Sequence, residues 1–423
     1  MIRQRHNVRA MGRGAQPAPR PTIGAAKKAL SCLVFLLFFA PPLHHGCLCQ
    51  AGSLVPCLKD IPPQVGFIAA DANGKILAKR HETDQFVPAS TLKILTALAS
   101  LHYLGPAYRF NTEFFLSPEK DLIVKGYGDP LLISEVWKEI SQQLALKLHG
   151  FRDLVLDSSY FSPAIRIPGV NSSTNPYDAP VGALCANFNT FFFERNSGNG
   201  VLSAEPQTPM IPFAKKKIRQ LRERKGRYTF SHDSREGARY AGELLRYFLE
   251  KNGVEGRGRV RHGIRAPEDS LIYTYRSGFT LEEILRKMFK FSNNFMANQL
   301  LISLGGHVYG APSTLAKGRS AILQYARENL RLKDLELVEG SGISRENRMS
   351  PEDMLMVLKQ FRPYRRLLAR KGSFLYKTGT LTGIHTRAGF YEKSPGTPGY
   401  FVLFLNHGEV DADGFMRCLG RLF

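Results

Sequence analysis

The chain has 423 residues, with 58 Lys+Arg against 36 Asp+Glu and a formal net charge of +22. Its 43% hydrophobic and 22% charged residues exclude a collagen, a disordered tail and a polytopic membrane protein. Six cysteines in so long a chain do not make a disulfide scaffold, and the positive charge predicts anionic surroundings such as nucleic acid, anionic lipid or an acidic wall polymer.

The first fifty residues indicate an export signal. Two lysines precede the mostly apolar run ALSCLVFLLFFA, which two prolines end. This run is shorter than the ~20 residues that span a bilayer and fits the apolar region of a signal peptide, with a buried helix as the weaker alternative. We predict a signal peptide and unstructured N-terminus over 1–51, cleavage after Ala51, and a periplasmic or otherwise exported protein. A lipid-attachment box fits Cys47 and Cys49 poorly.

The next part predicts a hairpin followed by a helix. In QVGFIAADANGKILAKR, two alternating apolar stretches flank Asn73-Gly74, the strongest short hairpin signal. The run FVPASTLKILTALASLHYLG then repeats apolar residues at helical spacing and ends at Gly105. Strands around a turn at Ser117–Lys120, a helix over 135–149 and a strand over 151–156 follow.

The middle of the chain, about 168–231, is rich in Asn, Ser, Pro and Gly and weakly periodic. Helical patterns return afterwards, and three strands and a short helix end the chain. The helices are expected at 235–252, 280–290, 293–304, 313–330, 351–368 and 411–422, and the strands at 373–378, 384–391 and 399–406. This order predicts one α+β domain, made of 52–110 and 266–423 and split by an inserted domain over 111–265.

The first motif with chemical potential is the S-x-x-K of Ser90 and Lys93. The spacing places both side chains on one face of a helix start, where a lysine of lowered pKa can accept the proton of a serine nucleophile. Ser117-Pro118-Glu119-Lys120 matches the same pattern but lies in a polar turn. Alone, the pattern is more often an N-cap serine with a solvated lysine.

Two further motifs follow. Ser292-Asn293-Asn294 is an S-x-N motif between two helical patterns. These residues either cap a helix or offer a hydroxyl that relays a proton to a leaving group and a carboxamide that binds a substrate amide. Lys377-Thr378-Gly379 lies on a strand-like segment, where a glycine leaves room for a ligand backbone and the lysine can hold a carboxylate. Each motif alone is common, and only the ordered conjunction of the three is specific.

The surrounding sequence resembles the DacB-type D-alanyl-D-alanine carboxypeptidase/endopeptidase family, a class of low-molecular-mass penicillin-binding proteins. The resemblance rests on VPASTLKILTALASLHYLGPAYRFNTEF, GYGDPLL, DAPVGALCANFN, FSNNFMANQLL, EGSGISRENRMSP and YKTGTLTG. It implies a penicillin-binding/β-lactamase-like transpeptidase domain, an antiparallel sheet flanked by helices, with the insertion between the first two motifs. It also implies a serine-type D-Ala-D-Ala carboxypeptidase that acts on peptidoglycan stem peptides through an acyl-enzyme and is acylated by β-lactam antibiotics. Activity on D-amino-acid cross-links stays open.

The resemblance also implies residue roles. Ser90 is expected to be the nucleophile, Lys93 its general base and Ser292 the relay that protonates the departing D-alanine. The substrate is expected to meet the amide of Asn294, the ammonium of Lys377 and the Lys-Thr-Gly strand, with its terminal carboxylate held by Thr378 and Thr380 beside Gly379. The backbone N–H groups of Ser90 and Thr380 are expected to form the oxyanion hole. The loop 340–348 is expected to border the cleft, with no role assigned.

Several alternatives and absences accompany this reading. A β-lactamase remains possible in principle, but the chain has no E-x-x-L-N to supply the deacylating glutamate of class A enzymes. A non-catalytic wall-binding protein is disfavoured because every motif residue is present. Without H-E-x-x-H or C-x-x-C we expect no metal and no cofactor.

The family usually carries a larger insertion. Here the stretch after Phe193 is short and partly replaced by the basic run 215–227, with eight cations and one acid. This run is either a solvated face or a contact to anionic wall polymer or membrane, and nucleic acid is not expected for an exported chain. Because the first strand and last helix are often neighbours in this fold, Cys57 and Cys418 are expected to lie close.

Overall fold

The computed structural model describes residues 65–198, 200–392, 397–406 and 412–422, which all fall in one structural unit, Cys49–Phe423. The expected signal peptide over 1–51 and Cys57 lie outside the described residues. None of the described helices is long and apolar enough to cross a membrane.

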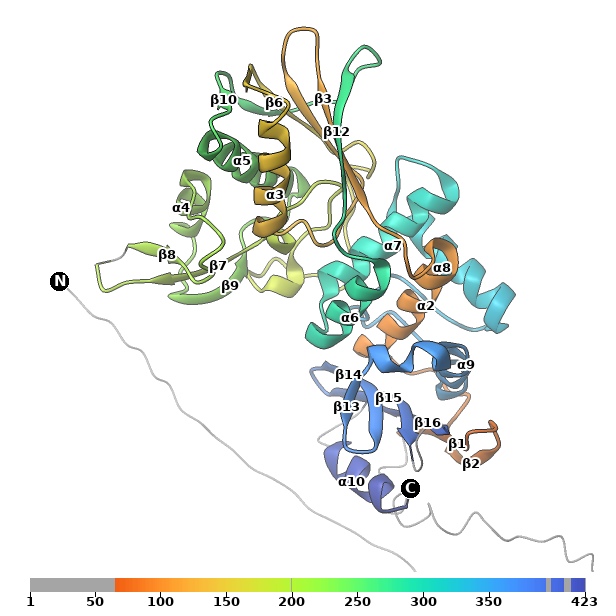
Figure 1. Cartoon of the computed structure of the whole chain (residues 1–423). Coiled ribbons are helices and arrows are strands. Elements are labelled where there is room, and N and C mark those ends of the chain that lie inside the picture. Colours follow the sequence, from red (N-terminus) through yellow and green to blue (C-terminus); the bar gives the residue numbers. More distant parts are fainter. Residues whose placement is uncertain (1–64, 199, 393–396, 407–411, 423) are drawn as a thin grey trace, which may run out of the picture. The chain divides into compact units, whose positions relative to one another are not determined.

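A six-stranded antiparallel sheet joins the two ends of the described chain (Figure 1). Its order is β13-β14-β15-β16-β1-β2. The predicted hairpin is confirmed, because β1 (Val65–Ala70) pairs with β2 (Ile76–Arg80) across a turn in which Gly74 has φ +86°. The other strands are β13 (Ala369–Lys371), β14 (Phe374–Leu381), β15 (Ile384–Glu392) and β16 (Pro398–Leu405). Strand β1 also pairs with β16, so that Val65 faces Leu405.

Helices cover both faces of this sheet, because alternate residues of its central strands point to opposite sides. Ile68 and Val402 belong to the main core, into which α9 (Pro351–Phe361) packs, whereas Phe67 and Phe401 pack against α10 (Ala412–Leu422). Figure 1 shows α9 and α10 on the two sides of the sheet. The arrangement confirms the predicted α+β class with an antiparallel sheet flanked by helices.

A layer of helices packs next to the sheet and carries the S-x-x-K and S-x-N motifs. Helix α7 (Asn294–Tyr309) is its buried centre, contacting α2 (Lys93–Leu104) and α8 (Leu315–Leu330), while α6 (Leu281–Phe291) contacts α2. The capping box of Thr280 and Glu283 starts α6, and the Asn293 side chain accepts a hydrogen bond from the Met296 N–H at the start of α7. These caps fix the short connection between α6 and α7.

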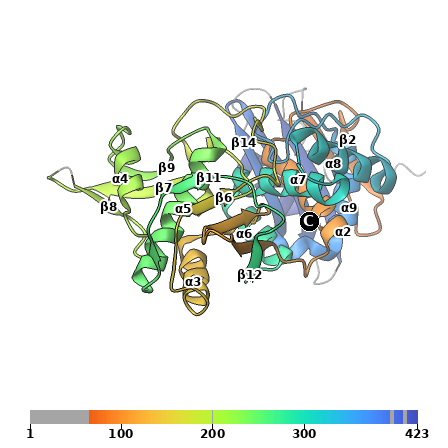
Figure 2. The ribbon, with the colours of Figure 1, turned by 90° about the horizontal axis from the view of Figure 1, so that it is seen from above.

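A second sheet of five strands lies in the part of the chain predicted to be an insertion. Its order is β11-β6-β4-β3-β12; helix α5 (Ser234–Lys251) packs against β6 and β11, and α3 (Ser134–Ala145) packs against α5. Figure 2 shows α5 beside β6 and β11. The strands are β3 (Asn111–Leu116), β4 (Leu122–Gly126), β6 (Leu154–Asp157), β11 (Val260–His262) and β12 (Ser270–Arg276). Because β12 pairs with β3, the sheet extends past residue 265, where the predicted insertion ends. A two-stranded pair, β5 (Gly150–Phe151) and β10 (Glu255–Gly256), adjoins it.

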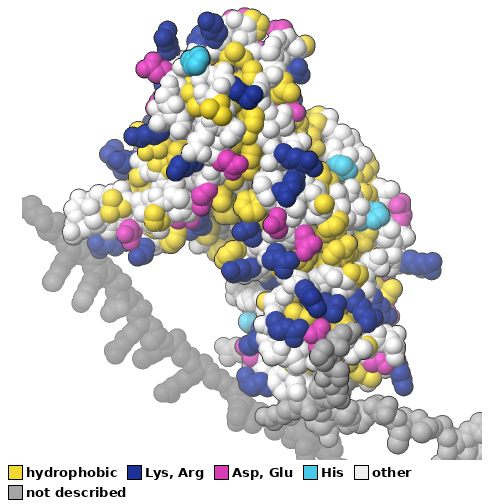
Figure 3. Space-filling model, viewed as in Figure 1, with side chains coloured by type: hydrophobic (Ala, Val, Ile, Leu, Met, Phe, Trp, Pro, Cys, Tyr) yellow, Lys and Arg dark blue, Asp and Glu magenta, His cyan; other side chains and the backbone are white. Residues whose placement is uncertain are grey.

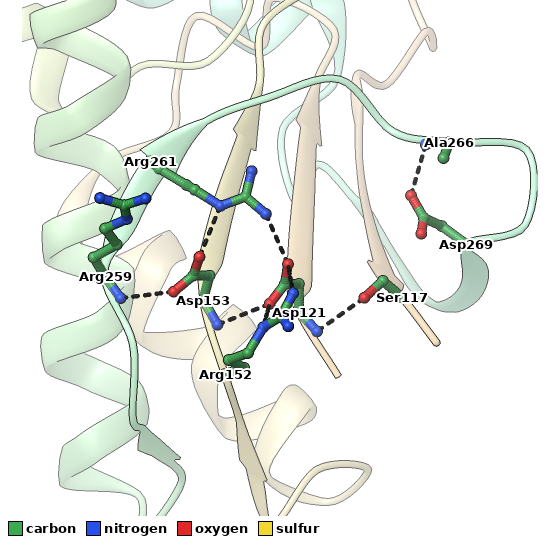
Figure 4. Close-up of polar contacts among 8 residues, drawn as sticks. All are labelled: Ser117, Asp121, Arg152, Asp153, Arg259, Arg261, Ala266 and Asp269. Carbon is green, nitrogen blue, oxygen red and sulfur yellow. Dashed lines mark hydrogen bonds and ion pairs between the residues drawn. The ribbon is translucent and has the colours of Figure 1, made fainter. Parts of the chain in front are cut away.

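An ion-pair network ties the strand ends of this second sheet together (Figure 4). Asp121 accepts hydrogen bonds from Arg152 Nε at 2.6 Å, from Arg261 Nη2 at 2.7 Å and from the Asp153 N–H at 3.0 Å. The Asp153 carboxylate in turn accepts from Arg261 Nε at 2.8 Å. The hydrogen bond from Arg152, with those from Asp153 and Arg261, lowers the pKa of Asp121 to about 2.

The weakly periodic middle contains a third, three-stranded sheet that the sequence did not predict. Its order is β8-β7-β9, with β7 (Thr190–Arg195), β8 (Val201–Ser203) and β9 (Lys225–Thr229). The basic run 215–227 forms the end of α4 (Pro212–Ile218), a loop and the start of β9. Its exposed cations are Lys215, Lys216, Arg219, Arg222, Arg224 and Lys225. Figure 3 shows Lys and Arg side chains spread over one face of the molecule with acidic side chains between them.

The two cysteines among the described residues, Cys185 and Cys418, differ in state. Cys185 is a buried free thiol, and burial raises its pKa. Cys418, on α10, is disulfide-bonded. Because Cys57 lies outside the described residues, its predicted proximity to Cys418 stays a prediction.

Candidate active site

Ser90 lies in a short 3₁₀ helix, Ala89–Leu92, that leads directly into α2. Ala89 has φ +46°, a left-handed conformation that only surrounding contacts can hold in a residue with a Cβ. The carbonyl of Pro88 accepts hydrogen bonds from Thr91 Oγ1 at 2.6 Å and from Thr386 Oγ1 of β15 at 2.8 Å. These two bonds fasten the strained entry to the helix, and with it Ser90, to the six-stranded sheet.

Lys93 is fully buried one turn after Ser90. Its Nζ donates to Ser90 Oγ at 2.9 Å, to Asn294 Oδ1 at 2.7 Å and to the carbonyl of Ser341 at 2.7 Å. Burial, and then the nearby charge of Lys377, hold the pKa of Lys93 well below its ordinary value, while the Glu339 carboxylate acts in the opposite direction. Because its pKa is lowered, this amine loses its proton more readily than an ordinary lysine, and in its deprotonated form it can accept the proton of the Ser90 hydroxyl.

The S-x-N motif occupies the junction of α6 and α7. Ser292 ends α6 in a left-handed conformation, Asn293 caps α7, and Asn294 is the first residue of α7 and a partner of Lys93. Asn293 therefore fills the structural role that the sequence alone left open, which leaves Ser292 and Asn294 to face the site. Of the residues in this motif, Asn294 is the hydrogen-bond partner of Lys93 Nζ; the other partners of this amine are Ser90 and Ser341.

A cavity of about 680 Å³ lies beside these residues and is lined by Ser90, Ser292 and Asn294. Its far wall comes from the 111–265 part of the chain and includes Phe188 and Arg227. The guanidinium of Arg227 lies 6.0 Å from the ring centre of Phe188 and pairs with Glu205. The cavity has room for a peptide-sized ligand at the serine hydroxyl.

The Lys-Thr-Gly motif lies on β14, directly against the 3₁₀ helix. A Cβ built on Gly379 would stand 2.8 Å from the Ser90 backbone nitrogen, so only a glycine permits this approach. Lys377 is buried, and burial followed by the charge of Arg387 lowers its pKa to about 8. Its Nζ donates to the carbonyl of Thr378. The side chains of Thr378 and Thr380 are exposed beside it.

The loop 340–348, to which no role was assigned, and Glu339 just before it complete the surroundings of Lys93. Gly342, at φ +79°, lies so close to the nucleophile segment that an added Cβ would stand 1.9 Å from the Ala89 carbonyl oxygen. Glu339 is fully buried at the start of this loop, and its carboxylate accepts from the Ser341 and Gly342 N–H groups at 2.7 and 2.6 Å. Glu339 was not predicted as a site residue; its signal in the sequence is an acid immediately before Gly-Ser-Gly, which is weak by itself.

The competing S-x-x-K at Ser117 has a structural explanation. Ser117 Oγ accepts the Asp121 N–H at 3.1 Å in the turn between β3 and β4, as Figure 4 shows. Lys120 takes φ +63° in the same turn. This pair closes a turn and does not form a catalytic constellation. Within the described ranges, no group of three or more His, Cys, Asp and Glu is arranged to hold a metal ion.

Comparison with known proteins places this geometry in a family. The chain is 26% identical over 410 residues to the D-alanyl-D-alanine carboxypeptidase DacB of Haemophilus influenzae, covering 81% of this chain and 85% of that protein. It is 26% identical over 360 residues to the D-alanyl-D-alanine carboxypeptidase of Actinomadura sp. strain R39, covering 70% of this chain and 64% of that protein.

Solved structures agree in fold. The crystal structure of penicillin-binding protein 4 (dacB) from Haemophilus influenzae superposes on this chain with a TM-score of 0.71. The structure of its complex with a β-lactam superposes with a TM-score of 0.66. Each covers 87% of this chain and 98% of that chain at 23% identity. The sequence profile of the D-Ala-D-Ala carboxypeptidase 3 (S13) family matches residues 54–368. The chain, with its serine, lysines and asparagine converging from three remote segments, belongs to the D-Ala-D-Ala carboxypeptidase 3 (S13) family.

Proposed function

We propose that the protein is a serine-type D-Ala-D-Ala carboxypeptidase that acts on peptidoglycan stem peptides through an acyl-enzyme. The observation that carries the proposal is the buried Lys93 Nζ, of lowered pKa, 2.9 Å from the hydroxyl of Ser90. Membership of the S13 family and the names of the relatives support the same substrate class.

In the proposed first step, Lys93 Nζ takes the proton of Ser90 Oγ while the oxygen attacks the carbonyl carbon of the penultimate D-alanine. The developing oxyanion is received by the backbone N–H groups of Ser90 and Thr380. The C–N bond then breaks, and the proton passes through the Ser292 hydroxyl to the amine of the departing D-alanine. Water next adds to the ester carbon and releases the shortened peptide, which restores Ser90.

The remaining residues are proposed to bind the substrate. Lys377 supplies positive charge for the terminal carboxylate, which Thr378 and Thr380 contact. Gly379, between these two threonines, has no side chain and so lets β14 lie close to Ser90. Asn294 offers its amide to the peptide backbone. A β-lactam carries a carboxylate and an acyl group in the same relation, so we propose that it acylates Ser90 and is released slowly.

The decisive experiment exposes purified protein to a fluorescent penicillin and, in parallel, measures D-alanine released from a stem pentapeptide. Wild-type protein and the matched control Ser117→Ala, which removes the serine of the competing S-x-x-K, should form the adduct and release D-alanine. Ser90→Ala should do neither. An adduct that survives Ser90→Ala would defeat the assignment, and rapid turnover of the penicillin would favour a β-lactamase.

Three finer points belong to the same proposal. Digestion of purified muropeptides, with the products identified by mass, separates loss of the terminal D-alanine from cleavage of a cross-link. The exposed cations of the basic run 215–227 are proposed to contact anionic wall polymer. Salt-sensitive sedimentation with peptidoglycan, compared with anionic vesicles, tests that contact, and detection of the protein in the periplasmic fraction tests export.

A further inference from the structure

The loop after α8 contains a buried carboxylate with an unusual number of donors around it. Glu339 Oε2 accepts from the Ser341 N–H at 2.7 Å and from Ser341 Oγ at 2.6 Å. Its Oε1 accepts from the Gly342 N–H at 2.6 Å, from Asn347 Nδ2 at 2.7 Å and from the Ser344 N–H at 3.4 Å. Both ends of the loop therefore fold around one side chain, since a buried carboxylate is stable only when its oxygens are satisfied.

This loop is also pinned to the helical layer. The Gly340 N–H donates to Asn298 Oδ1 of α7 at 2.7 Å, and the Gly340 carbonyl accepts from Thr96 Oγ1 of α2 at 2.7 Å. Ser341, the residue after Gly340, accepts a hydrogen bond from Lys93 Nζ at its carbonyl, 2.7 Å away. The position of this carbonyl, and with it the orientation of the amine toward Ser90, depends on the bonds that Glu339 accepts.

We propose that Glu339 is a positioning residue for the acylation step, which holds the 340–347 loop so that the Ser341 carbonyl fixes the amine of Lys93 on Ser90. The charge of Glu339 raises the pKa of this amine, whereas the charge of Lys377 lowers it. Around Lys93, β14 contributes the cation Lys377 and α7 contributes the neutral amide of Asn294. Among the described residues, Glu339 is the anion that acts on this amine. The inference rests on the proposed function, because it concerns the base of that reaction.

The consequence for catalysis has two separable parts. Loss of the loop geometry should slow acylation, because the amine no longer points at the serine hydroxyl and small misplacements are costly. Loss of the negative charge should make Lys93 deprotonate at lower pH, because the carboxylate is the group that raises the pKa of this lysine. If Glu339 were only structural, its replacement would slow acylation in proportion to the fraction of unfolded protein. It would not change the pH at which Lys93 deprotonates.

The test measures the rate of Ser90 acylation by a fluorescent penicillin as a function of pH in three variants. Glu339→Gln should reduce the maximal rate at least tenfold and move the rising limb of the profile to lower pH. Glu339→Asp keeps the charge but is too short for all five donors, so its rate should fall while its rising limb stays at the wild-type pH. The matched control Glu346→Gln, an exposed acid on the same loop, should behave as wild type.

The outcomes separate this inference from the proposed function. Absence of a Ser90 adduct in wild-type protein would refute the proposed function itself. A wild-type adduct together with an unmoved rising limb in Glu339→Gln would overturn the role of Glu339. If Glu339→Gln does not fold, wild-type acylation by Glu339→Asp overturns the positioning role on its own.

Discussion

Gly379 offers a direct test of how the nucleophile segment is packed. A Cβ added there would stand 2.2 Å from Thr386 Oγ1, 2.8 Å from the Ser90 nitrogen and 2.9 Å from Ala89 Cβ. Ordinary contacts between carbon atoms lie at ~3.5 Å or more, so Gly379→Ala must displace these atoms by roughly 1 Å. Thr386 cannot simply rotate away, because its hydroxyl donates to the Pro88 carbonyl at 2.8 Å.

The expected magnitude follows from that displacement. Overpacking of a tight site costs about 1–3 kcal/mol of unfolding free energy. A misplacement of about 1 Å at the serine reduces acylation on the order of 100-fold. Gly379→Ala should therefore remain folded, with a lowered melting temperature, while its rate of acylation by fluorescent penicillin falls much more than its folded fraction.

The control for this experiment is Gly278→Ala, since a Cβ at that exposed glycine meets nothing closer than 3.8 Å. It should match wild type in both melting temperature and acylation rate. Acylation of Gly379→Ala at the wild-type rate, in protein that melts as wild type does, would refute the close approach of β14 to Ser90.

Three further predictions concern other parts of the molecule. The acylation rate should rise with pH as Lys93 loses its proton and fall above about pH 8, where Lys377 becomes neutral. Arg387→Gln removes a neighbouring positive charge and should move that falling limb to higher pH; an unchanged limb in the measured pH–rate profile contradicts the electrostatic link. Asp121→Asn should lower the free energy of unfolding at neutral pH by about 1–2 kcal/mol. This is the value of a pKa lowered from 3.8 to about 2, reduced for partly exposed arginine partners. Because the pKa is lowered in the folded state, the contribution is complete above about pH 4 and disappears as the pH falls through about 2, so urea titrations at neutral and acid pH should show the gap closing. Cys185 should resist alkylation in native protein and react after denaturation, as peptide mass spectrometry can show, since it is buried and burial raises the pKa of its thiol.

The sequence predicted the parts of this fold that carry strong local signals. Asn73-Gly74 predicted a hairpin, and apolar spacing predicted the described α-helices except α4, which lies in the weakly periodic middle. The order of three motifs predicted which residues to examine at one site. Strand β7, TFFFER, was hidden because the stretch around it is rich in turn residues and lacks alternation. Sequence order also could not reveal how close β14 and the nucleophile segment lie.

Glu339 illustrates why the rest of the site was out of reach. Its donors are backbone N–H groups and two small polar side chains of its own loop, none of which marks a binding site in the sequence. The proposed role of Glu339 depends on the nearby amine of Lys93, which belongs to α2, far away in the sequence. Only the folding of the chain brings an acid and a base that are so far apart in sequence to the same place.

The pairing of β1 with β16 affects how the protein reaches its working state. The first strand of the described chain has its neighbour among the last, with Val65 facing Leu405. During synthesis, β1 therefore cannot pair with β16 until nearly the entire polypeptide has been made, and one of its edges stays open until then. A truncated or stalled chain would hold Ser90 and Lys93 but lack the closing strands, which leaves it inactive and exposes an adhesive strand edge to proteases and to other chains.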